Sequence, residues 1–328
     1  MSLIIRIQCN NMNEEKLRPG VETLKSGGTV VFPTETVYGL GADATSDDAC
    51  MKIFNAKGRP VDNPLIVHFS DISDLDKYTY WSHVAKRKEL ERLWPGPLTV
   101  IVKKKDLICD TASAGLPTVG VRIPDCNFSR ELIRRCGSPV AAPSANVSGR
   151  PSATSIDHIL EELGHRVDIM YSAESPRYGI ESTVILPEGN KCTILRPGAY
   201  TEEDLLKIFD SVGYARVGEK VMSPGMKYRH YSPEKILFRA SPDRILQEIA
   251  GKNDLLPIVS TELGEKINGK KLVLGSVKDP ISISSNLYKC LRELDRSSHR
   301  GGIIEAFPEV GYFVSVMNRV KKASIELE

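Results

Sequence analysis

Short runs of β-branched residues punctuate the first two-thirds of this 328-residue chain and limit the folds open to it. Each run has four to six residues and is rich in Val, Ile and Thr, which is typical of strands. The runs cover residues 29–32, 65–69, 98–102, 119–123, 183–186 and 192–195. Apolar residues at helical spacing occupy 47–55, 84–94 and 156–163, and a capping pattern at 201–204 begins a further helix. Because the two kinds of segment do not alternate strictly, we expect an α/β domain built on a mixed sheet.

The regular pattern ends at residues 211–233, which hold Gly, Pro, Tyr, Met and Arg. This segment is too aromatic for a plain flexible linker, which would be rich in Gly and Ser. Beyond it, strand-like runs alternate with helical stretches near 242–250, 283–295 and 311–323. That alternation is typical of a small open α/β domain with a parallel sheet. The sequence therefore predicts a first domain over 1–210, a linker over 211–233 and a second domain over 234–328.

The composition is that of an ordinary globular protein, with 41% hydrophobic residues, 26% charged residues and a net charge of +2. It excludes disordered, collagen-like and disulfide-scaffold classes, and the charge identifies no nucleic-acid partner. The seven cysteines are odd in number and never spaced as CxxC, so we expect reduced thiols and no zinc ribbon. No apolar stretch has the length that spans a membrane, and the start of the chain, interrupted by Arg6, predicts a strand rather than a signal peptide. We therefore expect a cytoplasmic protein with no membrane partner.

Two segments imitate nucleotide-binding motifs. Residues 39–44 match GxGxxA, but the helical pattern begins only at Asp47, whereas a dinucleotide fingerprint opens the helix directly. Residues 213–220 resemble a Walker A loop, but Glu219 stands where the phosphate-binding lysine belongs. We therefore assign no nucleotide site to either segment.

Lys57 and Arg59 follow the helical pattern that covers 47–55. Cations are favoured at helix C-termini by the macrodipole, which explains Lys57 without a function. A lysine and a forked arginine two residues apart, beside a glycine, would also grip polyphosphate. Residues 33–41 combine hydroxyls, a carboxylate and glycines, and fit either a turn with local Thr hydrogen bonds or part of a site.

His68 and Arg122 project from predicted strands on the faces opposite their apolar neighbours. Both positions fit either ordinary surface residues or the lining of a cleft built on a sheet. Residues 143–149, with Ser152 just beyond, fit either a polar turn before a helix or a loop that binds an anion. Residues 181–183 and 195–198 add further polar groups next to strands, and each of these signals is weak by itself.

Together and in this order, the motifs resemble those of the threonylcarbamoyl-AMP synthase family, the YrdC-like proteins, in its long two-domain form. The residues that carry the resemblance are 33–41, Lys57-Gly-Arg59-Pro with 62–65, His68, Pro143-Ser144-Ala-Asn146, Ser182-Thr183 and Arg196-Pro-Gly198. Residues 223–233 look like the interdomain linker of the long form, and residues 317–323 like the end of its second domain. The resemblance covers nearly the whole chain.

The resemblance implies a nucleotidyltransferase that condenses L-threonine, bicarbonate or carbon dioxide, and ATP into threonylcarbamoyl-AMP and pyrophosphate. Partner threonylcarbamoyl transferase proteins would then pass the activated group to an adenosine beside the anticodon of tRNA. The implied first domain has a twisted mixed α/β sheet with a concave, positively charged cavity, and the smaller second domain is Rossmann-like. Magnesium is expected to arrive with the phosphates of ATP rather than in a dedicated metal site.

By matching motif positions, the resemblance implies two sets of binding residues. Those around L-threonine are Thr36, His68, Arg122, Ala142 and Ser182. Those around ATP are Arg59, Asn63, Thr118, Ser144, Ser152, Arg196 and His230, with Lys57 and Asn146 completing the KxR and SxN pairs. We expect Arg122 to pair with the threonine carboxylate, and Lys57 and Arg59 to balance triphosphate charge. These three residues are the catalytic candidates, because the reaction needs positioning and charge neutralisation more than a covalent nucleophile.

Residues 227–231 offer cations and aromatic faces, so we expect the linker to fold over the loaded cavity and exclude water. Two other functions remain open. A positive concave sheet could bind RNA without chemistry, with an affinity that depends on salt. A carbamoyl-transfer enzyme of hydrogenase maturation contains a related domain, but it would also carry zinc-finger CxxC pairs, which this sequence lacks.

Overall fold

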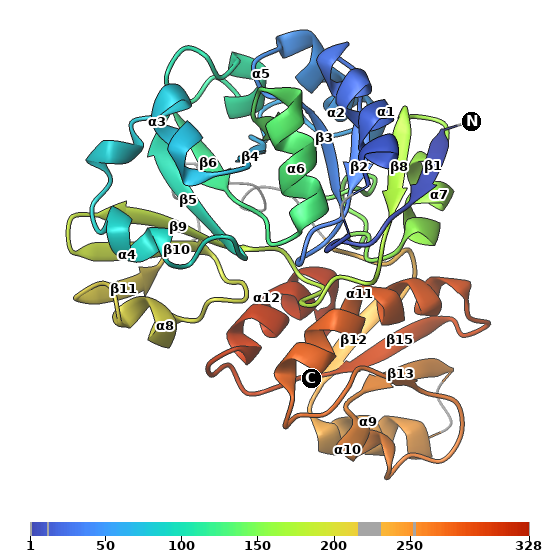
Figure 1. Ribbon diagram of the computed structural model, residues 1–328. Coiled ribbons are helices and arrows are strands. Elements are labelled where there is room, and N and C mark those ends of the chain that lie inside the picture. Colours follow the sequence, from blue (N-terminus) through green and yellow to red (C-terminus); the bar gives the residue numbers. More distant parts are fainter. Residues whose placement is uncertain (1, 12, 216–230, 252–253, 328) are drawn as a thin grey trace.

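The computed structural model describes residues 2–11, 13–215, 231–251 and 254–327. These residues form two domains, each built on its own sheet (Figure 1). The larger sheet has 11 strands in the order β1-β8-β2-β3-β7-β4-β6-β5-β9-β10-β11 and mixes parallel with antiparallel pairs. The mixed sheet predicted for the first domain is therefore confirmed.

The strands of the larger sheet are short, and most coincide with the β-branched runs of the sequence. They are β1 (Leu3–Arg6), β2 (Val30–Phe32), β3 (Gly39–Asp43), β4 (Ile66–His68), β5 (Leu98–Lys103), β6 (Thr118–Arg122), β7 (Val140–Ala141), β8 (Ile169–Ser172), β9 (Thr183–Glu188), β10 (Lys191–Arg196) and β11 (Ser211–Tyr214). The glycines of the GxGxxA segment lie within β3, an antiparallel partner of β2, and not at a helix start. The structure agrees that this segment is no dinucleotide fingerprint.

Helices cover both faces of the larger sheet. On one face, α1 (Glu14–Lys25) and α6 (Asn127–Cys136) bury Leu17, Phe128 and Leu132 against β2 and β8. On the other face, α2 (Asp47–Lys57) and α7 (Ile156–Leu163) contribute to the main core. Short helices complete this domain: α3 (Leu75–Tyr78), α4 (Arg87–Glu91), α5 (Asp110–Ser113) and α8 (Glu202–Leu206), with 3-10 turns at Ile72–Asp74 and Trp81–His83.

Two of the predicted helix starts and one predicted helix length can be checked in detail. Ser46 caps α2 and Thr201 forms the predicted capping box of α8, each through its side-chain oxygen. The helix predicted over 84–94 is wrong in extent, because only Arg87–Glu91 is helical. Leu90 and Trp94 are buried as their spacing predicts, but Trp94 reaches the core from a turn and packs against Trp81.

The second domain has a five-stranded sheet, β14-β13-β15-β12-β16, in which every pair is parallel, as predicted. Its strands are β12 (Ile236–Ala240), β13 (Leu255–Val259), β14 (Leu272–Val273), β15 (Gly301–Glu305) and β16 (Ile325–Glu326). The helices α9 (Pro242–Ala250) and α10 (Thr261–Gly264) pack on one face, and α11 (Pro280–Arg296) and α12 (Phe313–Ala323) on the other. Figure 1 shows that α11 and α12 are the pair that faces the larger domain.

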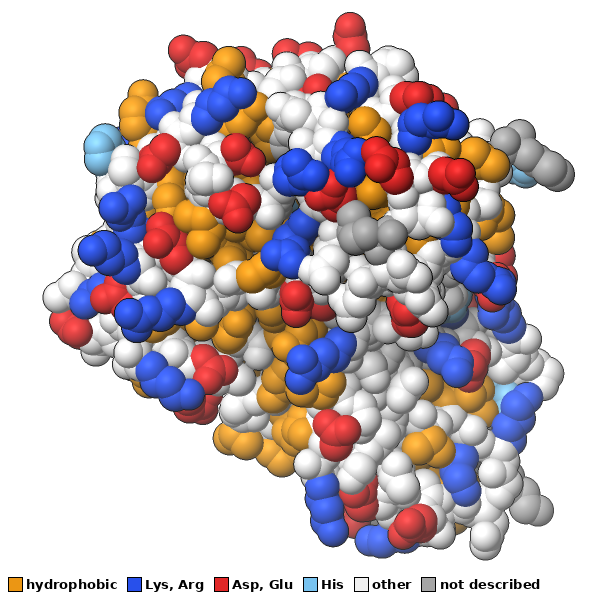
Figure 2. Space-filling model, viewed as in Figure 1, with side chains coloured by type: hydrophobic (Ala, Val, Ile, Leu, Met, Phe, Trp, Pro, Cys, Tyr) orange, Lys and Arg blue, Asp and Glu red, His pale blue; other side chains and the backbone are white. Residues whose placement is uncertain are grey.

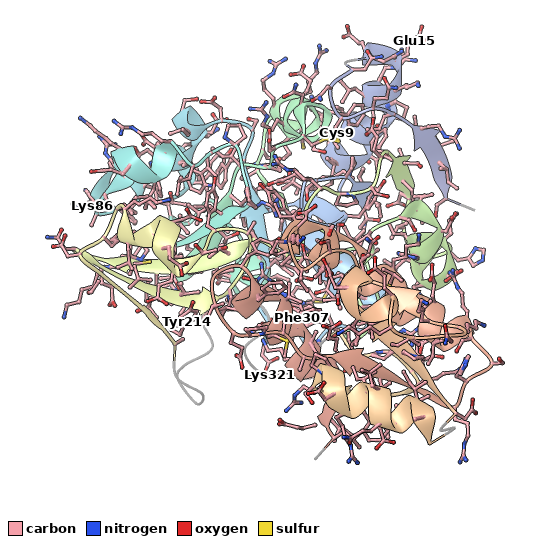
Figure 3. All side chains as sticks on the ribbon, turned by 90° about the horizontal axis from the view of Figure 1, so that it is seen from below. Cys9, Glu15, Lys86, Tyr214, Phe307 and Lys321 are labelled. Carbon is pink, nitrogen blue, oxygen red and sulfur yellow. A yellow bond between two sulfur atoms is a disulfide. The ribbon has the colours of Figure 1, made fainter. Side chains whose placement is uncertain are left out.

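Two expectations from the sequence differ from the structure. Ser211–Tyr214, inside the predicted linker, forms β11 and pairs with β10 at the sheet edge, where Tyr214 is labelled in Figure 3. Residues 211–214 show no regular pattern of buried side chains, because pairing with β10, and not burial of side chains, stabilises this strand. Cys9 and Cys126, expected as reduced thiols, are paired as a disulfide. Their separation of 117 residues hides a pairing that folding creates by placing the start of α6 beside the end of β1.

The surface carries both signs of charge. On the face shown in Figure 2, basic and acidic side chains are interspersed over both domains, which agrees with the small net charge. Among the residues that the structure describes, every helix is too short or too polar to cross a lipid bilayer.

Candidate functional site

A cavity at the carboxyl ends of the central strands β4 and β6 gathers most of the residues predicted from the sequence. Eight of them line it, and they are Thr36, Arg59, His68, Arg122, Ala142, Ser144, Ser182 and Arg196. Three of the eight are arginines, which gives the cavity the positive character expected of it. His68 and Arg122 are register partners on the parallel strands β4 and β6, so the sheet itself places them side by side. Both are at least 95% buried, and the interpretation as surface residues is therefore wrong.

Arg122 is held by a carboxylate that the sequence reasoning left without a role. One guanidinium nitrogen donates to Glu35 Oε1 at 2.7 Å, and Glu35 Oε2 accepts the backbone N–H of Asp125 at 2.9 Å. The Nε atom of Arg122 is buried and has no hydrogen-bond partner among the described residues. A buried donor without a partner costs free energy, so a ligand acceptor that reached this atom from the cavity would offset that cost.

His68 lies in the same wall, edge-on to the ring of Phe32. Burial first, and then the charge of Arg122, lower the pKa of His68 to about 3. The imidazole is therefore neutral at physiological pH, and its buried Nδ1 has no hydrogen-bond partner among the residues described. A neutral ring offers one donor and one acceptor to a polar ligand.

The segment over 33–41 is both a local turn and part of the cavity, so the two interpretations of it combine. The hydroxyl of Thr34 donates to the carbonyl of Val37 at 2.7 Å and lies 2.8 Å from the hydroxyl of Thr36. These contacts fix Thr36 at the cavity wall. Local Thr hydrogen bonds thus shape the turn that presents the site residue.

Lys57 does not line the cavity, although it stands next to residues that do. Its Nζ is buried and donates to the carbonyls of Ser144 and Asn146, each at 2.5 Å. Burial, followed by the charge of Arg59, lowers the pKa of Lys57 well below its ordinary value. The side chain of Asn146 accepts from Ser144 Oγ at 2.5 Å and donates to the carbonyls of Val147 and Arg150. Lys57 and Asn146 therefore shape the loop that presents Ser144.

Arg59 and Arg196 are oriented by backbone carbonyls. Arg59 donates to the carbonyls of Asn63 and Pro64 at 3.1 and 3.0 Å. Arg196 donates to the carbonyl and to the hydroxyl of Ser182, both at 3.1 Å. Burial lowers the pKa of Arg59 to about 10, which still leaves it charged at neutral pH. Two oriented guanidinium groups in one cavity suit a ligand with several negative charges.

Glu181 and Tyr231 also line the cavity. Neither was among the predicted binding residues, although Tyr231 ends the segment over 227–231 that was expected to fold over the cavity. Glu181 accepts a hydrogen bond from Ser152 Oγ at 2.5 Å, so Ser152 reaches the cavity through this carboxylate. Tyr231 is the first described residue after the gap in the linker. A signal for both was present in the sequence, because Glu181 precedes Ser182 and Tyr231 follows His230.

The remaining predicted residues are placed away from the lining or cannot be placed. Asn63 is buried, and its carbonyl orients Arg59. Thr118 begins β6 while Arg122 ends it, so the two are about 13 Å apart along the strand, and Thr118 lies in a separate groove with Tyr80 and His83. His230 and the rest of the segment over 216–230, which includes all of the predicted lid except Tyr231, lie outside the described residues. In the described ranges, no group of three or more His, Cys, Asp or Glu is arranged to hold a metal ion.

Comparisons with known proteins place this geometry in a family. Residues 22–198 match the Sua5_yciO_yrdC family, described as "Telomere recombination", and residues 200–324 match the threonylcarbamoyl-AMP synthase C-terminal domain. The threonylcarbamoyl-AMP synthase of Bacillus subtilis is 37% identical over 95% of this chain and 94% of its own length. The protein of the same name from Pyrococcus abyssi is 35% identical over 99% of this chain and 98% of its own.

Solved structures give the same result. The crystal structure of P. abyssi Sua5 complexed with L-threonine matches with a TM-score of 0.89 and 33% identity, and all of both chains is covered. Escherichia coli YciO, at 22% identity and a TM-score of 0.54, covers 61% of this chain and shares the fold. Both halves of the chain, and not only the cavity-bearing domain, are thus accounted for, and the chain belongs to the threonylcarbamoyl-AMP synthase family of enzymes.

Proposed function

We propose that this enzyme condenses L-threonine, bicarbonate or carbon dioxide, and ATP into threonylcarbamoyl-AMP and pyrophosphate. The observation that carries the proposal is the pair of buried, unpartnered atoms, Arg122 Nε and His68 Nδ1, in one cavity wall among the described residues. They offer a cationic donor and a neutral imidazole to a small ligand that has both a carboxylate and other polar groups. The relatives' name and the neighbouring structure complexed with L-threonine support this ligand.

L-threonine occupies the Arg122 side of the cavity in this proposal. Its carboxylate pairs with the guanidinium of Arg122, which Glu35 orients, and His68 meets a polar group of the amino acid. Thr36, Ala142 and Ser182 line the same cavity and complete the predicted threonine set. Because Arg122 and His68 are buried, these contacts form with little competition from water.

ATP occupies the side lined by Arg59, Ser144 and Arg196. The two arginines balance the triphosphate charge, and magnesium enters with the phosphates. Lys57 was expected to share that charge, and in the proposal it acts instead by holding the Ser144 loop. Asn63, Asn146 and Ser152 support lining residues, while ATP contacts by Thr118 and His230 remain predictions from the resemblance.

The chemistry follows from bringing the two substrates together. The amine of L-threonine adds to carbon dioxide and loses a proton, which forms a carbamate. A carbamate oxygen then attacks the α-phosphorus of ATP, and the bond to the bridging oxygen of pyrophosphate breaks in line. The cavity supplies orientation and positive charge for this displacement. A cytoplasmic location and transfer of the product to tRNA by partner proteins remain predictions.

Pyrophosphate release tests the proposal directly. The purified chain should release pyrophosphate from ATP and magnesium only when L-threonine and bicarbonate are both present. Mass spectrometry should find threonylcarbamoyl-AMP in equal amount. Release that does not depend on threonine, or salt-dependent RNA binding without any release, would contradict it.

A further inference from the structure

Two side chains of the second domain reach into the wall of the cavity in the first. Arg319 of α12 is fully buried, and its Nε and one terminal nitrogen each lie 3.1 Å from Glu181 Oε2. Tyr288 of α11 is also fully buried, and its hydroxyl lies 3.0 and 3.2 Å from the two oxygens of Glu181. These helices are the pair that faces the larger domain in Figure 1. The carboxylate of Glu181, a cavity residue of the first domain, is thus hydrogen-bonded by side chains of the second domain.

Arg319 also contacts the loop that carries Arg196. It donates to the carbonyls of Glu181 and Pro197, and Ser315, one turn earlier on α12, donates to the carbonyl of Gly198 at 2.7 Å. The Arg319 guanidinium lies 5.7 Å from the centre of the Tyr231 ring, another lining residue. One helix therefore contacts the cavity wall at Glu181, at the loop after Arg196 and at Tyr231.

The charges around Glu181 explain why its contacts with the second domain are important. Arg196 lines the cavity close to Glu181, yet the ion pair of Glu181 is with Arg319. Burial alone would raise the pKa of Glu181, but the charges of Arg319 and Arg196 outweigh it and lower the pKa to about 2. The carboxylate is therefore an anion that needs a counter-ion inside the protein. After Arg319, Arg196 is the charge that lowers the pKa of Glu181 most among the described residues, and an unpaired buried carboxylate is costly enough to capture it.

We propose that Arg319 and Tyr288 are positioning residues. Both bind the carboxylate of Glu181, so that Arg196 stays available to the phosphates of ATP. This inference rests on the proposed function in naming ATP as the ligand of Arg196. It gives the second domain a part in substrate binding, because the site is electrostatically complete only when α11 and α12 are docked on it.

The first test replaces Arg319 and measures ATP binding by equilibrium titration in the full chain. Arg319→Gln should weaken ATP binding by about 10- to 100-fold, the usual cost of losing one charge-assisted partner, and should change L-threonine binding by less than about threefold. The matched control is Arg296→Gln, since Arg296 pairs with Glu161 across the same domain junction but is half exposed. The control should bind ATP as the wild type does. Equal losses in the two variants would overturn the proposal.

A double variant separates capture of Arg196 from simple damage to the junction. In Glu181→Gln with Arg319→Gln, no carboxylate remains to capture Arg196, so ATP binding should recover about tenfold or more over Arg319→Gln alone. A double variant that binds ATP no better than Arg319→Gln would refute the proposed mechanism. A protein that binds ATP but forms no adenylate would refute the proposed function. The effect of Arg319 on ATP binding would still test the role proposed for Arg319 and Tyr288.

Tyr288→Phe provides a milder variant in case Arg319→Gln does not fold. It removes only the hydroxyl and keeps the ring that stacks on Tyr231. ATP binding should weaken by about 3- to 10-fold. Tyr312→Phe is its control, because that partly buried hydroxyl contacts Ser284 and does not line the cavity. Unchanged ATP binding in Tyr288→Phe would count against the proposal.

Discussion

The guanidinium of Arg122 and the carboxylate of Glu35 form a buried ion pair with a nitrogen–oxygen distance of 2.7 Å. Glu35 is fixed in turn by the backbone N–H of Asp125. The pair uses one terminal nitrogen of the guanidinium and leaves Nε without a partner among the described residues. Glu35 thus orients Arg122 without using all its donors, which suits a residue that must still bind a carboxylate ligand.

Arg122→Lys should therefore impair L-threonine binding while it leaves the positive charge in place. A lysine cannot reach Glu35 and a substrate carboxylate with the same planar fork. We expect the KM for L-threonine to rise by about 10- to 100-fold, with a much smaller change in the KM for ATP, measured by pyrophosphate release. Arg134→Lys, on an exposed arginine of α6, should have no effect. An unchanged KM for L-threonine in Arg122→Lys would show that Arg122 does not bind the carboxylate.

Lys57→Met should disturb the Ser144 loop rather than remove a phosphate ligand. The variant leaves the carbonyls of Ser144 and Asn146 without the Nζ donor, which should lower the free energy of unfolding by roughly 2–5 kcal/mol. ATP binding should weaken with it. Urea unfolding and ATP titration measure the two effects.

Lys52→Met is the control for Lys57→Met. Lys52 is exposed on the same helix and donates to a single carbonyl, that of Gly27. It should change the free energy of unfolding by less than about 1 kcal/mol. A Lys57→Met protein with normal stability but no ATP binding would instead favour direct phosphate contact.

Much of the fold could be predicted because its strands are carried by local composition. The β-branched runs correspond to β2, β4, β5, β6, β9 and β10, and the alternation after residue 234 gave the parallel sheet. The strands that were missed, such as β3 with its two glycines and β11, have weak intrinsic preference and are held by pairing with neighbours. The Cys9–Cys126 pair was missed for a related reason, since only the tertiary fold brings it together.

The site divides along the same line. His68, Arg122 and Ser182 line the cavity as predicted, because strand alternation and the motifs fix where such residues point. Sequence could not show that the Lys57 side chain points toward the Ser144 loop and binds its backbone carbonyls, since that depends on how the side chain is buried. It also could not show Arg319 beside Glu181, a contact across 138 residues that exists only when the domains dock.

Gly198→Ala should damage the site through the backbone. A Cβ at this position would lie 2.2 Å from the nitrogen of Thr183 and 2.5 Å from the carbonyl carbon of Ser182. The loop must shift away from β9, and overpacking of this kind typically costs about 1–3 kcal/mol. Thermal unfolding should show lower stability, and activity should fall because Arg196 moves with the loop.

The control for Gly198→Ala is Gly213→Ala in β11. Its added Cβ would meet no atom within 4 Å. Stability should stay within about 0.5 kcal/mol of the wild type, as for most surface substitutions. If both alanine variants behave alike, close packing of Gly198 against Ser182 and Thr183 is not what the loop requires.

The lowered pKa of His68 predicts that the folded protein loses stability in mild acid. Its pKa is lowered to about 3 in the folded protein by burial and by Arg122, against an ordinary value of about 6.5 in the unfolded chain. Between these values the unfolded chain binds a proton that the folded protein does not, so the free energy of unfolding falls as pH drops below about 6.5. From pH 7 to pH 5 this residue alone should remove about 2 kcal/mol.

His68→Asn isolates that contribution, because every other titrating group is common to both proteins. Urea unfolding without substrates should show the free energy of unfolding of the wild type falling by about 2 kcal/mol more than that of the variant between pH 7 and pH 5. His83→Asn, on an exposed imidazole, should follow the wild-type profile. Parallel profiles for the wild type and His68→Asn would mean that His68 is protonated in the folded protein at pH 5. A charged imidazole beside Arg122 would then offer two donors to the cavity, and the neutral His68 of the proposed threonine site would be wrong.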